Sequence, residues 1–254
     1  IQVNPVFFAG RYLKYERGIP QTRWDCRACR GVGCERCGFT GKQYADSVEE
    51  LIGRPVIEAF DARDAILHGA GREDIDARML GSGRPFVMEV EAPRKRSVDL
   101  VALEEEINRK AEGRVAVHLT GWADRKMVQT LKSDKAYKKY RILVEIDGPV
   151  TPDEFRAALD QLKGVTIRQR TPIRVSHRRA DRVRERQVID IQCTGRIDGR
   201  YRVEVVGEAG LYIKELVSGD GGRTRPSLAQ ILGRTARVVS LDVVQVKTTN
   251  EYGE

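Results

Sequence analysis

The sequence lacks any long apolar run, since nowhere do about eighteen apolar residues follow one another as a membrane-spanning helix requires. It also lacks a charged start that leads into an apolar stretch and a cleavage site, the pattern of a secretory leader. Both absences favour a soluble, cytoplasmic protein. The first residue is Ile rather than Met, which suggests a piece of a longer protein whose own N-terminal domain is left out.

Histidines are few, and none of the three lies next to a nucleophile pattern: His68, His118 and His177. Ser-His-Asp catalysis is therefore disfavoured. No glycine-rich turn of the cofactor-binding type joins a strand to a helix, which disfavours a methyltransferase. The glycine-rich segment 219–224 lacks the spacing and the lysine of a P-loop, so nucleotide binding is disfavoured as well.

Cysteines are few too, but four of the five lie within twelve residues: Cys26, Cys29, Cys34 and Cys37. A disulfide framework would be spread along the fold, whereas two Cys-x-x-Cys pairs can place four thiolates around one tetrahedral ion. The gap between the pairs is shorter than in common zinc ribbons, so an iron–sulfur cluster is the alternative. We interpret residues 24–43 as an inserted knuckle with a structural Zn²⁺, and Cys193 as a core residue.

Acidic residues are outnumbered, with 37 Asp and Glu against 45 Lys and Arg, and the net charge of +8 favours a polyanionic partner such as nucleic acid. The stretch 167–187 is densest in arginine, a side chain suited to phosphate because its fork donates two parallel hydrogen bonds. A salt-bridged surface is the alternative. The candidates for RNA contact in this stretch are Arg174, His177, Arg178 and Arg179.

Apolar periodicity predicts short strands mixed with helices. Strands are expected at 5–15, 86–91, 114–119, 140–146, 165–168, 187–192, 201–206 and 238–246. Helices are expected after Ser47, at 98–112, near Met127, and at 151–164, 212–217 and 227–232. Regular βαβ spacing is missing, so we predict an α+β fold around a largely antiparallel sheet, with two subdomains that divide near 147–165. Apolar periodicity fades between 61 and 83, where four glycines favour a long loop.

Three segments, taken in order, resemble the active-site motifs of pseudouridine synthases: Gly71-Arg72-Glu73-Asp74, Tyr140 at the start of a strand, and Gly210-Leu211-Tyr212-Ile213-Lys214-Glu215-Leu216. The order and spacing are more specific than any single segment. Four stretches, 9–12, 19–24, 71–86 and 170–179, are also similar to the archaeal and eukaryotic tRNA pseudouridine synthase family Pus Ten. The resemblance covers nearly the whole chain. The cysteine knuckle resembles archaeal members, and the family's N-terminal, RNA-binding THUMP-containing domain has no counterpart here.

The resemblance implies a pseudouridine synthase fold, an extended, mostly antiparallel sheet flanked by helices around a central active-site cleft. It implies that uridine is converted to pseudouridine in the T arm of tRNA, at positions 54 and 55, without a cofactor for catalysis. Asp74 would be the catalytic carboxylate, and Tyr140 would stack on the target base and take part in proton handling. Lys214 would pair with Asp74. Three further residues would contact the substrate: Arg72 would hold the flipped nucleotide, and Ile213 and Leu241 would form an apolar wall.

The chemistry fits these implied roles, because the site must hold a detached uracil while the N1–C1′ bond breaks and C5 joins C1′. Burial alone would raise the pKa of Asp74, and the charge of Lys214 would keep the carboxylate ionised. Asp76 is the rival carboxylate, and only the resemblance decides against it. The sequence leaves open whether Asp74 attacks the sugar or the base or removes a sugar proton, and whether one or both T-arm uridines react. A non-catalytic, zinc-containing RNA-binding protein is the alternative function.

Overall fold

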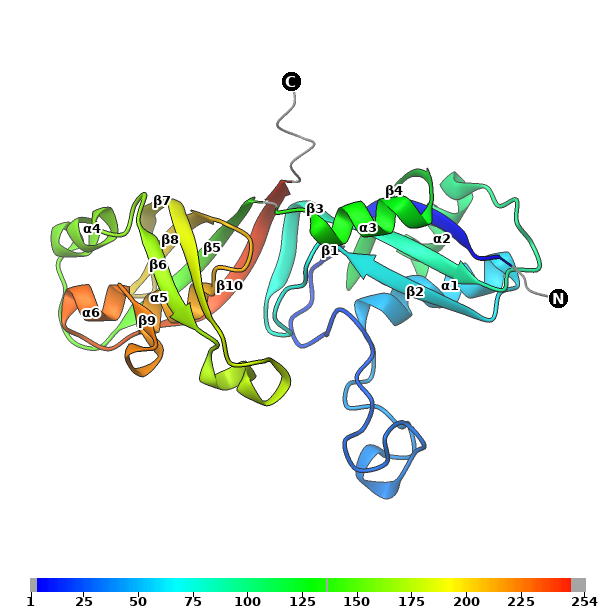
Figure 1. Ribbon diagram of the computed structural model, residues 1–254, viewed down its shortest axis with the longest axis horizontal. Helices are drawn as coiled ribbons and strands as arrows, with labels where there is room; N and C mark the ends of the chain where they lie inside the picture. Colours follow the sequence, from blue (N-terminus) through cyan, green and yellow to red (C-terminus); the bar gives the residue numbers. More distant parts are fainter. Residues whose placement is uncertain (1–3, 136, 248–254) are drawn as a thin grey trace. The chain divides into compact units, whose positions relative to one another are not determined.

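The computed structural model describes residues 4–135 and 137–247, apart from the side chain of Arg178. The chain divides into two compact units, Ile1–Asp134 and Lys135–Glu254 (Figure 1). The division precedes the boundary predicted near 147–165, because strand β5 (Tyr137–Ile146) pairs with two strands that follow it in the sequence. Every helix within the described residues is too short or too polar to span a bilayer.

Four antiparallel strands form the sheet of unit 1, in the order β4, β1, β3, β2. Their bounds are Val6–Lys14 for β1, Asp64–Gly69 for β2, Arg78–Glu91 for β3 and Val115–Ala123 for β4. The helices of this unit are α1 (Val48–Phe60), α2 (Leu100–Lys110) and α3 (Arg125–Ser133). The knuckle between β1 and α1 extends away from this sheet and contains a short 3-10 helix, Glu35–Cys37 (Figure 1, blue).

The core of unit 1 follows from two periodicities. Alternate residues of β1 face inward, so that Phe8, Tyr12 and Lys14 are fully buried. The apolar side of α1 covers the sheet, and Phe60 stacks on Phe8 with ring centroids 6.1 Å apart. The predicted start of α1 is confirmed, because the Ser47 hydroxyl accepts a hydrogen bond from a backbone amide of the first turn.

Unit 2 contains an antiparallel sheet with the strand order β10, β5, β8, β7, β6, β9. Besides β5, the strands are β6 (Thr166–Arg170), β7 (Val183–Ile197), β8 (Arg200–Gly207), β9 (Thr224–Arg225) and β10 (Ala236–Lys247). The helical segments are α4 (Pro152–Asp160), α5 (Ile213–Ser218), α6 (Leu228–Leu232) and the 3-10 helices η2 (Ile173–Arg178) and η3 (Asp220–Gly222).

Helix α4 packs on this sheet through an aromatic contact, in which Phe155 stacks on Tyr201 with centroids 3.8 Å apart. The predicted start of this helix at Thr151 is confirmed by a capping box, in which Thr151 and Glu154 satisfy each other's backbone amides. The helix ends at Asp160, before the predicted stop at Gly164, which takes a positive φ of 72° three residues beyond the C-cap.

The prediction of one long loop from 61 to 83 is wrong. Strand β2 and the first part of β3 lie inside it, because pairing with neighbouring strands outweighs the weak local signal. The glycines mark an irregularity in β3 rather than a loop. The register shifts where Gly83, at a φ of 76°, approaches the Tyr12 carbonyl so closely that a Cβ would lie 2.8 Å from its oxygen. The irregular segment shortens to residues 70–77.

Candidate active site and cysteine cluster

Asp74 lies in the irregular segment 70–77, which joins β2 to β3 in unit 1. The segment begins with a turn at Gly71, whose φ of 73° favours glycine. Asp74 is partly buried, whereas Arg72 and the rival carboxylate Asp76 are exposed. Partial burial suits a carboxylate that must meet a substrate and still be shielded from bulk water.

Side chains hold the backbone of this loop almost continuously, since five of its carbonyl groups accept hydrogen bonds from them. The pairs are Arg84 Nη1 with Ala70 (2.6 Å), Gln21 Nε2 with Gly71 (2.9 Å), Lys14 Nζ with Asp74 and Ile75 (both 3.2 Å), and Arg17 Nη1 with Asp76 (2.9 Å). Carbonyls outside regular structure need such partners when they are shielded from water. The loop around Asp74 is therefore held by side chains from three places: from β1, from the residues that directly follow β1, and from β3.

Glu73 turns inward from this loop into a buried ionic cluster with Tyr12, Lys14 and Arg84. Its Oε2 accepts hydrogen bonds from Tyr12 Oη at 2.8 Å and from Arg84 Nε at 2.9 Å, and Lys14 Nζ lies 3.7 Å from Oε1. The side chains of Lys14 and Glu73 are 0% exposed and that of Arg84 is 1% exposed. The cluster holds two cations and one anion.

The pKa shifts within the cluster favour an ionised Glu73 and a neutral Tyr12. Burial acts to raise the pKa of Glu73, but the charges of Arg84 and Lys14 and the Tyr12 hydroxyl outweigh it, so the pKa lies below its ordinary value. Burial raises the pKa of Tyr12 well above its usual value, and the Glu73 charge adds to this effect. Burial lowers the pKa of Lys14, against the attraction of Glu73. Glu73 is consequently a carboxylate and Tyr12 a neutral hydrogen-bond donor.

In unit 2 the structure brings Tyr140 and Leu241 onto neighbouring strands. Tyr140 of β5 is paired with Val243 of β10, and Leu241 is paired with Ile142. Because paired residues and alternate residues share a face, these four side chains lie together on one side of the sheet, and all are buried. Tyr140 and Leu241 thus form part of one apolar surface, as the predicted wall requires.

Ile213 and Lys214 open helix α5, which packs against β10, and the start of this helix is held by a buried amide. Gln169 Nε2 donates to the Tyr212 carbonyl at 2.9 Å, and the Tyr212 amide donates to Gln169 Oε1 at 2.9 Å. Gln169 is 0% exposed. Its side chain therefore fixes the residue that directly precedes Ile213, which is buried, and Lys214, which is partly buried.

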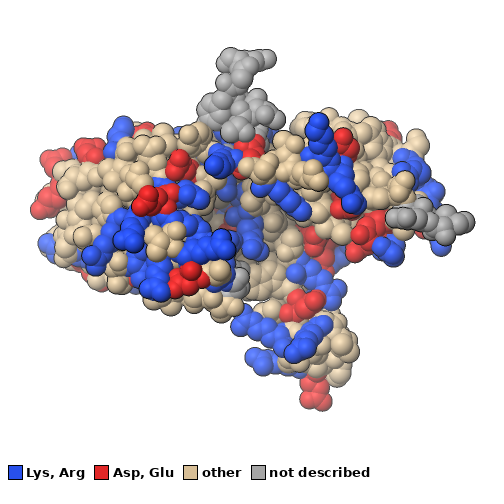
Figure 2. Space-filling model, in the orientation of Figure 1, with Lys and Arg blue, Asp and Glu red and all other residues tan. Residues whose placement is uncertain are grey.

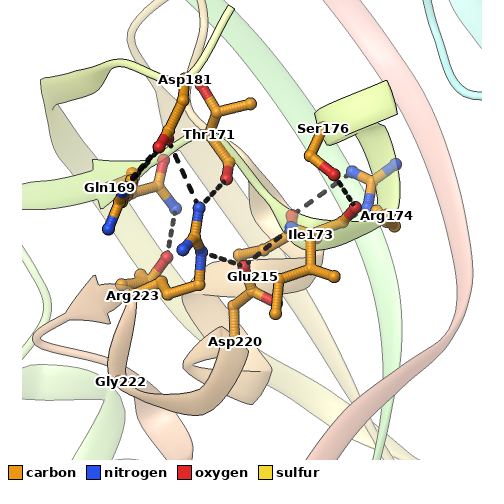
Figure 3. Close-up of polar contacts among 12 residues, drawn as sticks. Gln169, Thr171, Ile173, Arg174, Ser176, Asp181, Glu215, Asp220, Gly222 and Arg223 are labelled. Atoms are coloured by element: carbon orange, nitrogen blue, oxygen red, sulfur yellow. Dashed lines mark hydrogen bonds and ion pairs between the residues drawn. The ribbon is translucent and has the colours of Figure 1, made fainter. Parts of the chain in front are cut away.

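A second set of contacts ties η2 to α5 and to the glycine-rich segment after it (Figure 3). Arg174 donates from Nε and Nη2 to the Glu215 carboxylate at 2.7 and 3.3 Å. The Ile173 amide donates to Asp220 Oδ2 at 3.2 Å, and Arg223 Nη2 donates to the Thr171 carbonyl at 2.7 Å. The segment 219–224 is thus an internal anchor for η2.

Basic side chains gather on unit 2 over the elements of the 167–187 stretch, and Figure 2 shows them as a broad cationic area. His177 and Arg179 are exposed there, and Arg174 is exposed as a residue although its guanidinium is paired. The side chain of Arg178 lies outside the described part of the structure. Some of this charge is internally balanced, since Arg170 donates to the Asp181 carboxylate from Nε at 2.9 Å and from Nη2 at 2.5 Å.

The four knuckle cysteines converge, with all Sγ atoms within 4.8 Å of one another. The Sγ distances are 4.0 Å for Cys26–Cys34, 3.9 Å for Cys29–Cys37 and 3.8 Å for Cys34–Cys37. Tetrahedral zinc with Zn–S bonds of about 2.3 Å places its sulfur atoms about 3.8 Å apart. The donor set fits that ion.

Backbone amides donate hydrogen bonds to two of these sulfur atoms, those of Cys29 and Cys37. The Cys34 amide donates to Cys37 Sγ at 3.3 Å and the Gly41 amide at 3.2 Å, and these bonds lower the pKa of Cys37 to about 6. The Gly33 amide donates to Cys29 Sγ at 3.1 Å. Thiolates are the form that binds a metal ion. Cys193, which is partly buried in β7, takes no part in this cluster.

The predicted active-site residues therefore fall in both units. Asp74 and Arg72 belong to unit 1, whereas Tyr140, Ile213, Lys214 and Leu241 belong to unit 2. Within unit 2, Tyr140 and Leu241 come together on neighbouring strands, and α5 lies against β10. The pairing of Asp74 with Lys214 stays a prediction.

Sequence reasoning missed the residues that hold these segments: Tyr12, Lys14, Glu73, Arg84 and Gln169. One signal was present, because Lys14 occupies an inward position of the alternating strand β1, where a charge needs a partner. Nothing local marks Glu73 or Arg84 as its partners.

Comparison with known proteins identifies relatives over nearly the whole chain. The family model described as "Pus10, C-terminal" matches residues 7–247. The chain is 57% identical over 249 residues to the tRNA pseudouridine synthase Pus10 of Archaeoglobus fulgidus, covering 97% of this chain and 68% of that protein. It is 54% identical over 246 residues to the protein of the same name from Methanothrix thermoacetophila, covering 97% of this chain and 54% of that protein.

Among solved structures, a Cbf5-Nop10-Gar1 complex is similar with a TM-score of 0.50 and 18% identity, over 78% of this chain and 45% of that chain. This likeness concerns the fold alone. It agrees with the observed α+β architecture and its mostly antiparallel strands, and the predicted fold class is confirmed. Because the family model spans nearly all of the sequence, the chain belongs to the Pus10 C-terminal family.

Proposed function

We propose that this chain isomerises uridine to pseudouridine in the T arm of tRNA, at position 54, position 55 or both. The observation that carries the proposal is Asp74, held on a fixed loop in a chain more than half identical to proteins named tRNA pseudouridine synthase Pus10. The cytoplasm, where tRNA is found, is the expected location. The chain spans 54% of the length of the Methanothrix relative, and the full-length protein is expected to add RNA contacts through an N-terminal domain.

The reaction moves one bond and needs no redox partner. The N1–C1′ bond of uridine breaks, the uracil turns, C5 joins C1′, and the proton lost from C5 is balanced by one gained at N1. Asp74 is the proposed catalytic carboxylate, with Lys214 as its counter-charge. Tyr140, Ile213 and Leu241 retain the detached base in an apolar wall, and all three are buried.

The target nucleotide lies inside a folded stem-loop, so it must leave the stack before it can react. Arg72, which is exposed beside Asp74, is proposed to hold the flipped nucleotide. The basic area on unit 2 offsets the cost of flipping by binding phosphates, with Arg174, His177, Arg178 and Arg179 as the proposed contacts. A non-catalytic RNA-binding protein would need the basic area and the knuckle, but not a carboxylate fixed at the centre of a loop.

The test is Asp74→Asn, which keeps the shape of the side chain and removes the charge. Pseudouridine formation on a tRNA transcript should fall by about a thousandfold or more, because the reacting group is lost. The Kd for tRNA should change less than about twofold, since the phosphate contacts lie elsewhere. Asp76→Asn is the matched control and should react like the parent. Parent-like activity in Asp74→Asn would remove Asp74 from its role.

We also propose that the knuckle cysteines hold a structural Zn²⁺ that supplies no step of the reaction. Elemental analysis of the purified protein should find about one zinc per chain, and Cys26→Ser should lose the metal and melt earlier. Cys193→Ser, a cysteine outside the cluster, should keep both values. Iron in place of zinc, or unchanged metal content in Cys26→Ser, would contradict this assignment.

A further inference from the structure

The loop that carries Asp74 is held from one side by groups that no substrate reaches. The side chains of Lys14, Glu73 and Arg84 are at most 1% exposed, and Tyr12 is fully buried. Each of the three charged side chains lies in the loop or donates to it. Lys14 reaches the carbonyls of Asp74 and Ile75, and Arg84 reaches that of Ala70.

We propose that Glu73, through its buried contacts with Tyr12, Lys14 and Arg84, is a positioning residue that fixes the Asp74 backbone for the reaction. The inference rests on the proposed function, in which Asp74 is the reacting carboxylate. Glu73 acts as an anchor next to it in the chain: its carboxylate is bound inside unit 1 while Asp74, one residue later, remains partly accessible.

Stability alone gives a weak reason for such a cluster. Taking three charges out of water costs free energy, and well-packed apolar side chains of similar volume commonly stabilise a fold as well or better. The cluster instead fixes the position of the loop backbone. Lys14 Nζ donates to three carbonyl groups at once, those of Ile19, Asp74 and Ile75, at 2.7, 3.2 and 3.2 Å. An ammonium shared among fixed acceptors and a carboxylate tolerates little movement of the loop.

The same cluster joins the loop to the segment after β1. Gln21 Nε2 donates both to Tyr12 Oη at 2.8 Å and to the Gly71 carbonyl at 2.9 Å, so the Tyr12 hydroxyl links Gln21 to Glu73. The Ile75 carbonyl also accepts from the Gly18 amide at 2.9 Å. Asp74 is thereby bracketed by contacts at Gly71, Glu73 and Ile75. A displacement of about 1 Å at a reacting group can cost about a hundredfold in rate.

The experiment compares Glu73→Gln and Tyr12→Phe with the parent in single-turnover pseudouridine formation, at a temperature where each variant is fully folded. Glu73→Gln keeps the shape and loses the charge, and its rate should fall about tenfold or more while the Kd for tRNA stays within about twofold. Tyr12→Phe removes one hydroxyl and should lower the rate several-fold in the same way, and it keeps the test available if Glu73→Gln fails to fold.

Glu89→Gln is the control, because Glu89 is a carboxylate of unit 1 that is 16% exposed and, within the described residues, pairs with His68 and Arg125 rather than with the loop. Its rate should equal that of the parent. A folded Glu73→Gln or Tyr12→Phe with the parental rate would overturn the positioning role, and so would a loss confined to Kd. An inactive parent, or an active Asp74→Asn, would instead contradict the proposed function itself.

Discussion

The two units hold their candidate active-site residues by different means. In unit 1 the loop around Asp74 is anchored by a buried ionic cluster whose side chains are 0 to 1% exposed. In unit 2 the segment around Lys214 is anchored by a neutral amide, Gln169, and by an ion pair in which the Arg174 side chain is 33% exposed. Buried charges lose most when a partner is removed, whereas solvent screens exposed pairs. Removal of one charged partner should therefore lower the free energy of unfolding more in unit 1 than in unit 2.

The largest effect is expected for Arg84→Met, which leaves Glu73 buried without its closest cation. Breaking one partner of a buried ion pair typically costs about 3–5 kcal/mol, and the free energy of unfolding should fall by that order. Urea unfolding of the purified chain measures it. Arg109→Met, which removes an exposed arginine paired with Glu106, is the control and should unfold at the same urea concentration as the parent. Equal losses in the two variants would contradict the contrast between buried and exposed charge.

An intermediate effect is expected for Gln169→Leu. The substitution introduces an apolar side chain of similar size and leaves the Tyr212 amide and carbonyl without these partners, which should cost about 1–3 kcal/mol. Because Tyr212 precedes Lys214, the rate of pseudouridine formation should fall as well. The matched control is Gln161→Leu, at an exposed position, with little change expected in either quantity. If Gln169→Leu is destabilised but keeps the parental rate, the Gln169 side chain contributes to stability and not to the reaction.

The effect of Arg174→Met on stability should be smaller than that of Arg84→Met, because the guanidinium is 33% exposed to solvent, although its partner Glu215 is only 5% exposed. Its effect on tRNA binding is more informative. If Arg174 contacts a phosphate, the plot of log K for tRNA binding against log salt concentration should be less steep in Arg174→Met than in the parent, by about 0.7–0.9. An unchanged slope would assign Arg174 to Glu215 alone and remove it from the proposed RNA contacts.

Much of the fold could be predicted from the sequence because its signals are local. The strand predicted at 5–15 and the helix start predicted at Thr151 depend on residues close in the chain, and both are confirmed. Strand β2 and the first part of β3 were missed, because β2 depends on pairing with residues 86–91 of β3 and the first part of β3 on pairing with β1, rather than on a local pattern.

The candidate site divides in the same way. Asp74, Tyr140 and Lys214 stand in short motifs that a resemblance can identify. The groups that hold them are long-range: 59 residues separate Lys14 from Glu73, and 43 separate Gln169 from Tyr212. No periodicity or spacing links positions so far apart, and only the folded chain brings them together.

The most direct test of the central claim is to map pseudouridine by mass spectrometry in a tRNA transcript treated with this chain and with Asp74→Asn. We expect the parent to produce pseudouridine at one or both of the T-arm uridines, and the variant to bind the same transcript without producing any. A parent that binds tRNA and leaves every uridine unchanged, under conditions in which a full-length relative reacts, would contradict the claim that this chain carries the chemistry.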